Sequence, residues 1–357
     1  MTTRNACLAL TALHFLCVCA LSFEPPVYDG HQDLSYYLDE AGQRRPIETQ
    51  DDWAKRKAHV LAGLEATMGK LPRPEHKVPL DVKVVETRKI GPITRHKLAY
   101  HTDSAEQTVL AWLLLPARAD GQKLPAMLCL HQTVRIGKDE PAGLSDNQDL
   151  DYAWELAERG YVTLSPDYPS FGEYKYDFDS ADGYQSGSMK AVWDNIRAID
   201  LLSERPEVDS ARIGCIGHSL GGHNTMFTAA FEPRIKALVS NCGFCTMLKD
   251  DLPSWTGKVY MPLIASRYGN DVARLPWDFG EVAAAFAPRA FLASAAKGDD
   301  DFDWTGVADA VAVAAPIYDL HAAADNLQAN YFDGPHAFPP AARQRAYEFL
   351  DKHLHGP

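Results

Sequence analysis

The stretch of sequence that decides the fold spans residues 212–222 and reads Arg-Ile-Gly-Cys-Ile-Gly-His-Ser-Leu-Gly-Gly. Its first half is a short apolar run typical of a buried strand, and His223 to Ala230 have a composition that suits a helix. Between them, Gly217 to Gly221 match the G-x-S-x-G pattern, in which a serine occupies a sharp, strained turn. Glycines flank it because side chains there would collide with the neighbouring backbone. The pattern predicts that Ser219 is an exposed nucleophile.

A serine hydroxyl is a poor nucleophile at neutral pH, so this interpretation requires a histidine base and a carboxylate that orients the base. His336 is the predicted base, because it lies in a Gly/Pro-rich loop between a predicted strand and a helix predicted over residues 341–354. The competing histidines fit less well. His321 falls inside a helical run, and the last two histidines of the chain fall in its final turn and tail.

The carboxylate is expected to follow the strand predicted over residues 288–296, where the loop carries aspartates at positions 299, 300, 301 and 303. The usual spacing past a strand end selects Asp299, with Asp300 as the alternative. The resulting chain order of serine, aspartate and histidine is that of α/β-hydrolases, and it differs from the orders in chymotrypsin-like and subtilisin-like proteases. The order therefore predicts an α/β-hydrolase fold.

Acyl transfer also needs hydrogen-bond donors for the oxyanion of the tetrahedral intermediate. The backbone N–H of Leu220, directly after the nucleophile, is the predicted first donor. The second is expected where the buried strand near residues 125–130 opens into a loop, and there the N–H of Thr133 is favoured over that of Gln132. A structural role for His131, at the end of that strand, is compatible with this prediction because only the backbone acts.

Five stretches together resemble α/β-hydrolases of the dienelactone hydrolase and acetyl xylan esterase-like group. They are the serine turn and the runs at residues 130–138, 166–173, 287–289 and 336–339. The resemblance covers about residues 80–357, and it implies the fold and a Ser-His-Asp triad more firmly than a substrate. Dienelactone hydrolases proper use a cysteine nucleophile where this chain has Ser219, so the resemblance does not extend to their substrate.

The order of predicted elements indicates one large catalytic domain. An amphipathic helix over residues 51–69 is followed by antiparallel strands and then by alternating strands and helices, the pattern of a mostly parallel central sheet with helices on both faces. Strands are expected at about 82–87, 94–101, 109–115, 126–130, 161–165 and 235–240, and further helices at about 150–159 and 188–203. We divide the chain into a signal peptide at 1–22, an N-terminal helical extension packed on the catalytic domain at 23–80, and the catalytic domain at 81–357 with a candidate lid at 244–287.

Residues 1–22 have the pattern of a secretory signal peptide, with one basic residue, an apolar run from Cys7 to Cys19, and a small-residue cleavage site at Val18-Cys19-Ala20. The run is shorter than the roughly 20 residues of a membrane-spanning helix. An uncleaved anchor and a lipoprotein signal at Cys17 or Cys19 are the alternatives. The mature protein is predicted to be secreted or periplasmic, without stable membrane insertion.

Composition and motifs argue against several other classes of protein. The net charge is −13, and no Lys/Arg cluster would neutralise the phosphates of a nucleic acid. The glycine patterns of nucleotide-binding proteins are absent. Cys242 and Cys245 form a lone C-x-x-C, which suits a redox pair, a small disulfide loop or no function, and zinc is not expected without further ligands. We predict no cofactor and no metal.

Two loops are expected to select the substrate, at residues 168–185 and 244–287. The second loop contains Trp255, Tyr260, Tyr268 and Trp277. These aromatic side chains suit stacking against sugar rings, and they would equally suit pinning the loop to the domain. Trp304, just beyond the aspartate loop, is expected either to line the pocket or to pack beneath it. The predicted function is an exported serine hydrolase that cleaves a small-molecule or carbohydrate ester, such as an acetyl ester of xylan. A peptidase or amidase is the alternative, and the complete Ser, Asp and His set argues against a silent binding protein.

Overall fold

The computed structural model of the chain describes residues 25–72, 75, 77–104, 107–178 and 183–355. The predicted signal peptide over residues 1–22 lies outside these described residues, as do both cysteines of the alternative lipoprotein signal. Within the described part of the chain, no helix is both long and apolar enough to cross a membrane.

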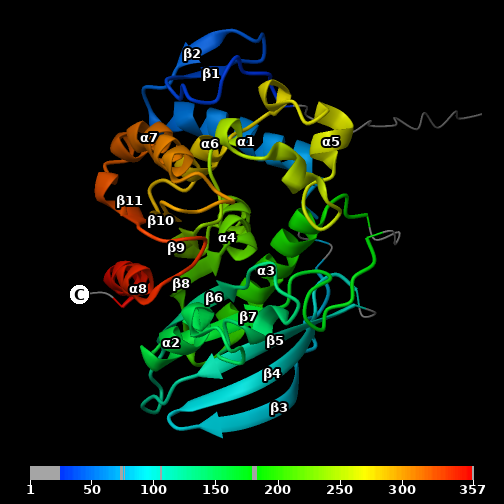
Figure 1. Ribbon diagram of the computed structural model, residues 1–357, viewed down its shortest axis with the longest axis vertical. Helices are drawn as coiled ribbons and strands as arrows, with labels where there is room; N and C mark the ends of the chain where they lie inside the picture. The colour runs from blue at the N-terminus through cyan, green and yellow to red at the C-terminus, as the bar shows by residue number, and fades with distance from the viewer. Residues whose placement is uncertain (1–24, 73–74, 76, 105–106, 179–182, 356–357) are drawn as a thin grey trace, which may run out of the picture.

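A nine-stranded sheet forms the centre of the molecule, in the order β11-β10-β9-β8-β6-β7-β5-β4-β3 (Figure 1). The strands from β11 to β7 in this order run parallel, whereas β5, β4 and β3 pair antiparallel at the other end. This topology confirms the predicted α/β-hydrolase fold. The strands of the sheet are β3 Lys83–Ile90, β4 Ile93–His101, β5 Thr108–Leu115, β6 Leu124–Leu130, β7 Val162–Pro166, β8 Val208–His218, β9 Ile235–Asn241, β10 Ala290–Ala296 and β11 Leu327–Phe332.

Helices cover both faces of this sheet. On β6, Met127 and Cys129 join a buried cluster shared with α2 and α8, whereas Leu128 and Leu130 join the larger core shared with α1, α3, α4, α6 and α7. Successive strand residues point to opposite faces, so a continuously apolar strand is one that is buried against helices on both sides. The helices are α1 Gln50–Met68, α2 Tyr152–Glu158, α3 Gly187–Glu204, α4 Leu220–Phe231, α5 Leu263–Tyr268, α6 Phe279–Ala284, α7 Trp304–Leu320 and α8 Pro340–Leu354, with short 3-10 helices η2 Gly137–Asp139, η3 Gln148–Leu150, η4 Met247–Lys249, η5 Leu252–Thr256, η6 Val272–Arg274 and η7 Ala324–Asn326.

A short antiparallel pair precedes α1, formed by β1 (Tyr36–Leu38) and β2 (Arg44–Pro46). The sequence pattern does not predict this pair, because three residues per strand are too few for a periodicity to show. The N-terminal segment is therefore not only helical. In Figure 1 it lies at one end of the molecule with α1, beside α5, α6 and α7.

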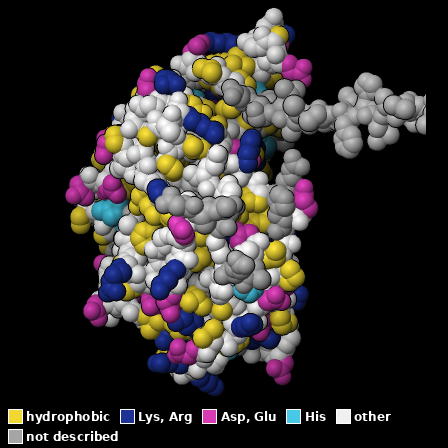
Figure 2. Space-filling model, turned by 90° about the vertical axis from the view of Figure 1, so that its right-hand side faces the viewer, with side chains coloured by type: hydrophobic (Ala, Val, Ile, Leu, Met, Phe, Trp, Pro, Cys, Tyr) yellow, Lys and Arg dark blue, Asp and Glu magenta, His cyan; other side chains and the backbone are white. Residues whose placement is uncertain are grey.

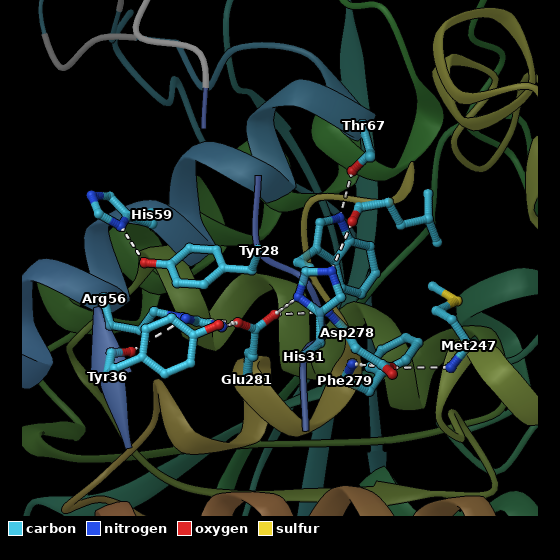
Figure 3. A network of polar contacts seen from close by, with 12 residues as sticks. Tyr28, His31, Tyr36, Arg56, His59, Thr67, Met247, Asp278, Phe279 and Glu281 are labelled. Carbon is cyan, nitrogen blue, oxygen red and sulfur yellow. Dashed lines mark hydrogen bonds and ion pairs between the residues drawn. The ribbon is translucent and has the colours of Figure 1, made fainter. Parts of the chain in front are cut away.

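A buried ion-pair network joins the N-terminal segment to α6. Arg56 on α1 and Glu281 on α6 are almost fully buried and form a salt bridge, with Arg56 Nε 3.0 Å from Glu281 Oε1. His31 makes a second contact, because its Nδ1 lies 2.7 Å from Glu281 Oε2 and its Nε2 lies 2.8 Å from the Leu275 carbonyl oxygen. Figure 3 shows His31 and Arg56 approaching Glu281 from separate segments of the chain.

The same carboxylate helps to start α6. Glu281 Oε2 accepts the backbone N–H of Asp278 at 3.1 Å, which completes a capping box at the N-terminus of the helix. Asp278 in turn accepts the backbone N–H of Met247 at 3.0 Å, and the neighbouring Trp277 donates its indole N–H to Thr67 on α1 at 2.9 Å. The hydrogen bond between Met247 and Asp278 thus joins the two ends of the segment 244–287, and Trp277 and Glu281 attach the segment to α1.

We expect the substitution Glu281→Gln to lower the free energy of unfolding by about 3–5 kcal/mol, because it leaves the buried Arg56 guanidinium without a counter-charge. Urea denaturation of the two proteins measures this difference. The matched control is Asp29→Asn, which removes the carboxylate of an exposed pair with Arg44 and should cost about 1 kcal/mol or less. Similar losses for both variants would contradict the central place given to Glu281.

The contact of His31 with Glu281 predicts a pH-dependent contribution to stability. Burial opposes protonation of His31, but the hydrogen bond and charge of Glu281 outweigh it and raise the pKa of His31. The contribution should be complete below the unfolded value of about 6.5 and should be lost as the pH rises through the higher folded pKa. The stability difference between wild type and His31→Gln, measured by urea denaturation, should therefore be larger at pH 6 than at pH 9. A difference that is the same at both values would contradict this account.

Candidate active site

Ser219 occupies the turn between β8 and α4, as the sequence predicts. Its backbone has φ 54° and ψ −121°, a left-handed conformation that is costly for a residue with a side chain. The surrounding packing enforces it: a Cβ on Gly221 would lie 1.9 Å from the Leu130 carbonyl oxygen, and one on Gly217 would lie 2.2 Å from the carbonyl group of Gly221. The backbone N–H of Ser219 donates to the Asn241 carbonyl at 3.0 Å. The turn is therefore wedged between β6 and β9.

The side chain of Ser219 is less exposed than expected. Its exposed fraction is 8%, so the sequence-based prediction of an exposed serine is wrong, because loops that follow other strands rise around the turn. Ser219 instead lines a cavity of about 90 Å³. The other residues that line this cavity are Thr133, Leu220, His223, Ser254, Trp255, Tyr260, Asp301 and Phe302.

His336 and Asp299 form a hydrogen-bonded pair. The Nδ1 atom of His336 lies 3.0 Å from each carboxylate oxygen of Asp299, whose Oδ1 also accepts the backbone N–H groups of Asp301 and Phe302. Burial alone would raise the pKa of Asp299, but these hydrogen bonds outweigh it, so the pKa of Asp299 is lowered. Burial alone would lower the pKa of His336, but the hydrogen bond and charge of Asp299 outweigh it, so the pKa of His336 is raised. With Nδ1 donating to Asp299, Nε2 of His336 is left with its lone pair. The alternative acid, Asp300, acts on His336 only through its charge.

A second layer of side chains holds the His336 loop. The amide of Asn241 donates to His218 Nδ1 at 2.8 Å and to the Ala337 carbonyl at 2.9 Å, so one side chain ties the loop to the strand that carries the serine turn. The ring of His218 lies 4.6 Å from that of His336, between centroids. Burial, aided by His336, lowers the pKa of His218 to about 3, so His218 packs there as a neutral ring.

The structure also brings the two expected oxyanion donors to the cavity. Leu220 is the first residue of α4, and its N–H is among those that have no acceptor within the helix. Thr133 lines the same cavity, with its hydroxyl 3.0 Å from that of Tyr260. His131 fixes the start of this loop: Nε2 accepts the N–H of Tyr168 at 2.9 Å, and Nδ1 donates to the Gln132 carbonyl at 2.6 Å. This histidine is therefore structural.

Cys242 lies beside the His336–Asp299 pair. Within the described residues, ligand atoms of these three side chains lie within 4.8 Å of one another. They do not suit a metal ion, because His336 and Asp299 already bond to each other, and burial together with the Asp299 charge raises the pKa of the Cys242 thiol. Cys242 and Cys245 are both free, so the small disulfide loop considered from the sequence is not present.

The aromatic residues expected to meet the substrate divide into two groups. Trp255 and Tyr260 line the cavity. Trp277 is fully buried and packs on Phe279 in the core, and Trp304 packs on Tyr331 with ring centroids 5.4 Å apart. The segment 244–287 therefore contains both kinds of aromatic side chain that the sequence left open. Trp255 and Tyr260 line the cavity, whereas Trp277 packs in the core.

Charged side chains of both signs are mixed on one face of the molecule. On the face drawn in Figure 2, Lys and Arg side chains are interspersed with Asp and Glu, and the described residues form no large basic patch there.

Two polar residues of the site were not predicted from the sequence. His223 lies four residues after Ser219, a spacing that places both on one face of a helix, so the helical prediction contained a signal for it. Asn241 ends a buried strand beside the serine strand, and a polar residue at that edge of a parallel sheet is a recognisable signal too. Neither residue belongs to the G-x-S-x-G pattern.

The model of the prolyl oligopeptidase family, which belongs to the α/β-hydrolase clan, matches residues 149–353. This range contains Ser219, Asp299 and His336. The match agrees with the fold and with the resemblance to α/β-hydrolase esterases. The narrower resemblance to dienelactone hydrolases stays a prediction.

Relatives and solved structures extend this comparison. The chain is 26% identical over 179 residues to 4-O-methyl-glucuronoyl methylesterase 1 of Sodiomyces alcalophilus, covering 44% of this chain and 36% of the relative. It is 29% identical over 143 residues to dipeptidyl-peptidase 5 of Porphyromonas gingivalis, covering 38% of this chain and 19% of that protein. The chain thus matches well under two thirds of either relative. A glucuronoyl esterase from Solibacter usitatus superposes with a TM-score of 0.69 at 19% identity, over 88% of this chain and 95% of that one, which shows a shared fold.

The pairing of His336 with Asp299 predicts how the histidine titrates. Its pKa should lie above about 6.5 in the wild type and should fall in Asp299→Asn, because burial remains while the opposite charge is removed. NMR titration of the imidazole resonances, assigned with His336→Gln, measures both values. In the matched control Asp300→Asn the pKa should fall less, since only a more distant charge is lost. A larger fall in the control would show that Asp300 is the true partner.

Proposed function

Because this chain belongs to the prolyl oligopeptidase family, we propose that it is a serine hydrolase that cleaves carboxylic esters of carbohydrates. The observation that carries the proposal is the cavity that Ser219 lines together with Trp255 and Tyr260, in a chain that also pairs His336 with Asp299. The curated esterase relative acts, by its name, on a methyl ester of a glucuronoyl group, and its similarity supports the choice of ester over other acyl compounds.

Ser219, His336 and Asp299 act in this proposal as a catalytic triad. The Ser219 hydroxyl attacks the ester carbonyl while Nε2 of His336 takes its proton, and the N–H groups of Leu220 and Thr133 stabilise the oxyanion. Collapse of the tetrahedral intermediate releases the alcohol with the proton from His336. Water, deprotonated by His336, then attacks the acyl-enzyme, and the carboxylic acid leaves as Ser219 regains its proton. Asp299 holds the imidazole tautomer and stabilises its charged form throughout.

The charge of the cavity favours a neutral ester over its acidic product. Asp301 lines the cavity, and Asp299 and Asp300 lie next to it in the chain. An ester carries no charge at the scissile group, whereas the acid formed on hydrolysis is an anion that the carboxylates repel. This repulsion assists product release and weakens product inhibition.

The sugar ring is the proposed partner of the aromatic wall. Trp255 and Tyr260 offer flat apolar surface, and the Tyr260 and Thr133 hydroxyls offer polar groups at its edge. A small number of polar groups in an otherwise apolar pocket is the usual design of a small-molecule site. Both an acetylated sugar and an ester of a uronic acid place a ring next to the scissile carbonyl, so both belong to the proposed class.

Export remains part of the proposal on the strength of residues 1–22 alone, whose sequence has the pattern of a signal peptide. A polymeric plant carbohydrate is met outside the cell, so a secreted or periplasmic location suits the proposed substrate. The candidate lid at 244–287 is likewise proposed, and it supplies Ser254, Trp255 and Tyr260 to the cavity.

A peptidase is the second candidate function. Asp301 in the cavity wall favours it, because a carboxylate there could pair with the terminal ammonium group of a peptide. The similarity to dipeptidyl-peptidase 5 points in the same direction. The two candidates differ in the leaving group, which is an alcohol in one and an amine in the other.

The proposed function predicts that the purified mature protein releases acetate from acetylated xylan or methanol from methyl glucuronate, and that Ser219→Ala reduces this rate by a factor of about 10⁶. Acid release and 4-nitrophenyl acetate hydrolysis are followed side by side. The matched control is Ser254→Ala, which removes a hydroxyl from the same cavity and should keep the rate within about tenfold. Labelling by a fluorophosphonate should be lost in Ser219→Ala and retained in the control.

The outcomes separate the candidates. Cleavage of dipeptidyl nitroanilides with no release from either sugar ester would replace the esterase with a peptidase. Turnover of 4-nitrophenyl acetate alone would keep the serine hydrolase and reject the carbohydrate substrate. Labelling that persists in Ser219→Ala would reject Ser219 as the nucleophile.

A further inference from the structure

A second and larger cavity lies between α1 and the segment that contains α5 and η6. Its volume is about 630 Å³, against about 90 Å³ for the cavity around Ser219, and the two share no lining residue among the described residues. Figure 1 shows α5 beside α1. Ala62 and Ala66 lie one turn apart on the face of α1 that lines the cavity, and their small side chains leave room for it. We call this cavity the α1–α5 groove.

Three exposed cationic side chains line the α1–α5 groove, namely Lys70, Arg267 and Arg274. Lys70 pairs with Glu65, with 2.8 Å between Nζ and Oε2. The two guanidinium groups bond only to backbone carbonyl oxygens among the described residues. Arg267 donates to one carbonyl of α1 at 3.1 Å, and Arg274 donates to two carbonyls of α5 at 3.0 and 3.3 Å. Within the described part of the chain, the groove thus holds two arginines without a carboxylate partner, although the net charge of the protein is −13.

The chemistry of the α1–α5 groove suits a carboxylate carried on a sugar. A guanidinium group has five N–H donors in a planar fork that matches the two oxygens of a carboxylate. The bonds to carbonyl oxygens use one donor of Arg267 and two of Arg274, so both keep donors for a ligand. The half-buried ring of Tyr268 and the methyl groups of Ala62 and Ala66 supply apolar surface for the C–H face of a sugar ring. Three cations are too few to follow the backbone of a nucleic acid.

The α1–α5 groove is within reach of a carbohydrate bound at Ser219. The cavity around Ser219, at about 90 Å³, is smaller than the roughly 300–1,000 Å³ of a typical small-molecule site, so most of an oligosaccharide would lie outside it. Arg267 follows Tyr260, which lines that cavity, by seven residues. Seven residues span at most about 25 Å even when fully extended. An oligosaccharide of several sugar units covers such a separation.

We propose that the α1–α5 groove binds a free uronic acid on the carbohydrate that carries the scissile ester, with Arg267 and Arg274 as the partners of its carboxylate. The identity of this ligand rests on the proposed carbohydrate esterase function. The groove selects acidic over neutral polysaccharides and takes no part in the reaction at Ser219. Because this binding is equal in the ground state and the transition state, it lowers KM for an acidic polymer and leaves kcat unchanged.

The test measures binding by calorimetry to the Ser219→Ala protein, so that no probe is hydrolysed. The probes are xylotriose that carries one free glucuronic acid and plain xylotriose. The acidic probe should bind more tightly. Its Kd should rise about tenfold or more when Arg267→Gln and Arg274→Gln are combined, because charge-assisted hydrogen bonds are lost, whereas the Kd of the neutral probe should stay within about twofold. Salt at about 1 M should remove most of the difference between the probes.

The matched control is Arg118→Gln. Arg118 is also exposed and bonds only to backbone carbonyl oxygens among the described residues, but it lines a separate cavity near the turn between β3 and β4. This variant should bind the acidic probe like its parent. With Ser219 present, the double variant should hydrolyse 4-nitrophenyl acetate like the wild type, which checks that the segment 244–287 keeps its fold. Combining Arg267→Lys with Arg274→Lys should restore part of the lost affinity, because the charges return without the planar forks.

Equal affinity for the two probes would overturn the proposal, and so would an equal loss of affinity in Arg118→Gln. Displacement of the acidic probe by an equal concentration of inorganic phosphate would overturn it as well, because the groove would then be a general anion site. Hydrolysis of a sugar ester without binding of the acidic probe would keep the esterase and reject the groove. Binding that is lost in the double variant, in a protein that cleaves neither sugar ester, would keep the groove and reject the esterase.

Discussion

The close approach of the serine turn to strand β6 is the constraint on which the rest of the site depends. Gly221 packs so closely on the Leu130 carbonyl that no side chain fits between them, and Ser219 is held in a left-handed conformation that it would not adopt in isolation. The strain is offset by the hydrogen bonds and packing of a sheet that is buried on both faces. Because β6, β8 and β9 are neighbours, the loops that follow them meet at the same edge, and Ser219, the Thr133 loop and Asn241 come together there.

The walls of the cavity depend on a second, more distant constraint. Trp255 and Tyr260 come from the segment 244–287, which contains α6 and is bonded to α1 through Trp277 and Thr67. Glu281 is the centre of that attachment, since it pairs with Arg56, contacts His31 and completes the cap of α6. The segment that supplies Trp255 and Tyr260 to the cavity is thus tied to the N-terminal part of the chain by a buried ion pair. A buried ion pair contributes little net stability by itself, but removing one partner is strongly destabilising. This property suits a contact that fixes one arrangement of the segment 244–287 on α1.

Much of the site could be predicted because its residues follow the ends of strands in a known order. The serine turn has a sequence pattern with a mechanical cause, and His336 stands out as the histidine in a Gly/Pro loop. The aspartate loop was ambiguous, since neighbouring aspartates differ only in the direction of their side chains, and the structure pairs Asp299 with His336. The aromatic residues of 244–287 could not be sorted in advance, because burial of Trp277 depends on contacts with α1 and α4 that have no local signal.

The sequence by itself determined the fold class, the strand–turn–helix around Ser219 and the order of the candidate triad, because hydrophobic periodicity and glycine geometry act over a few neighbouring residues. Only the tertiary structure decided that Ser219 is buried and lines a cavity, that Asp299 pairs with His336, and that His223 lines the same cavity. Those features arise where segments far apart in the chain meet. Their contacts depend on side-chain direction and on the space that other loops leave, and neither is encoded locally.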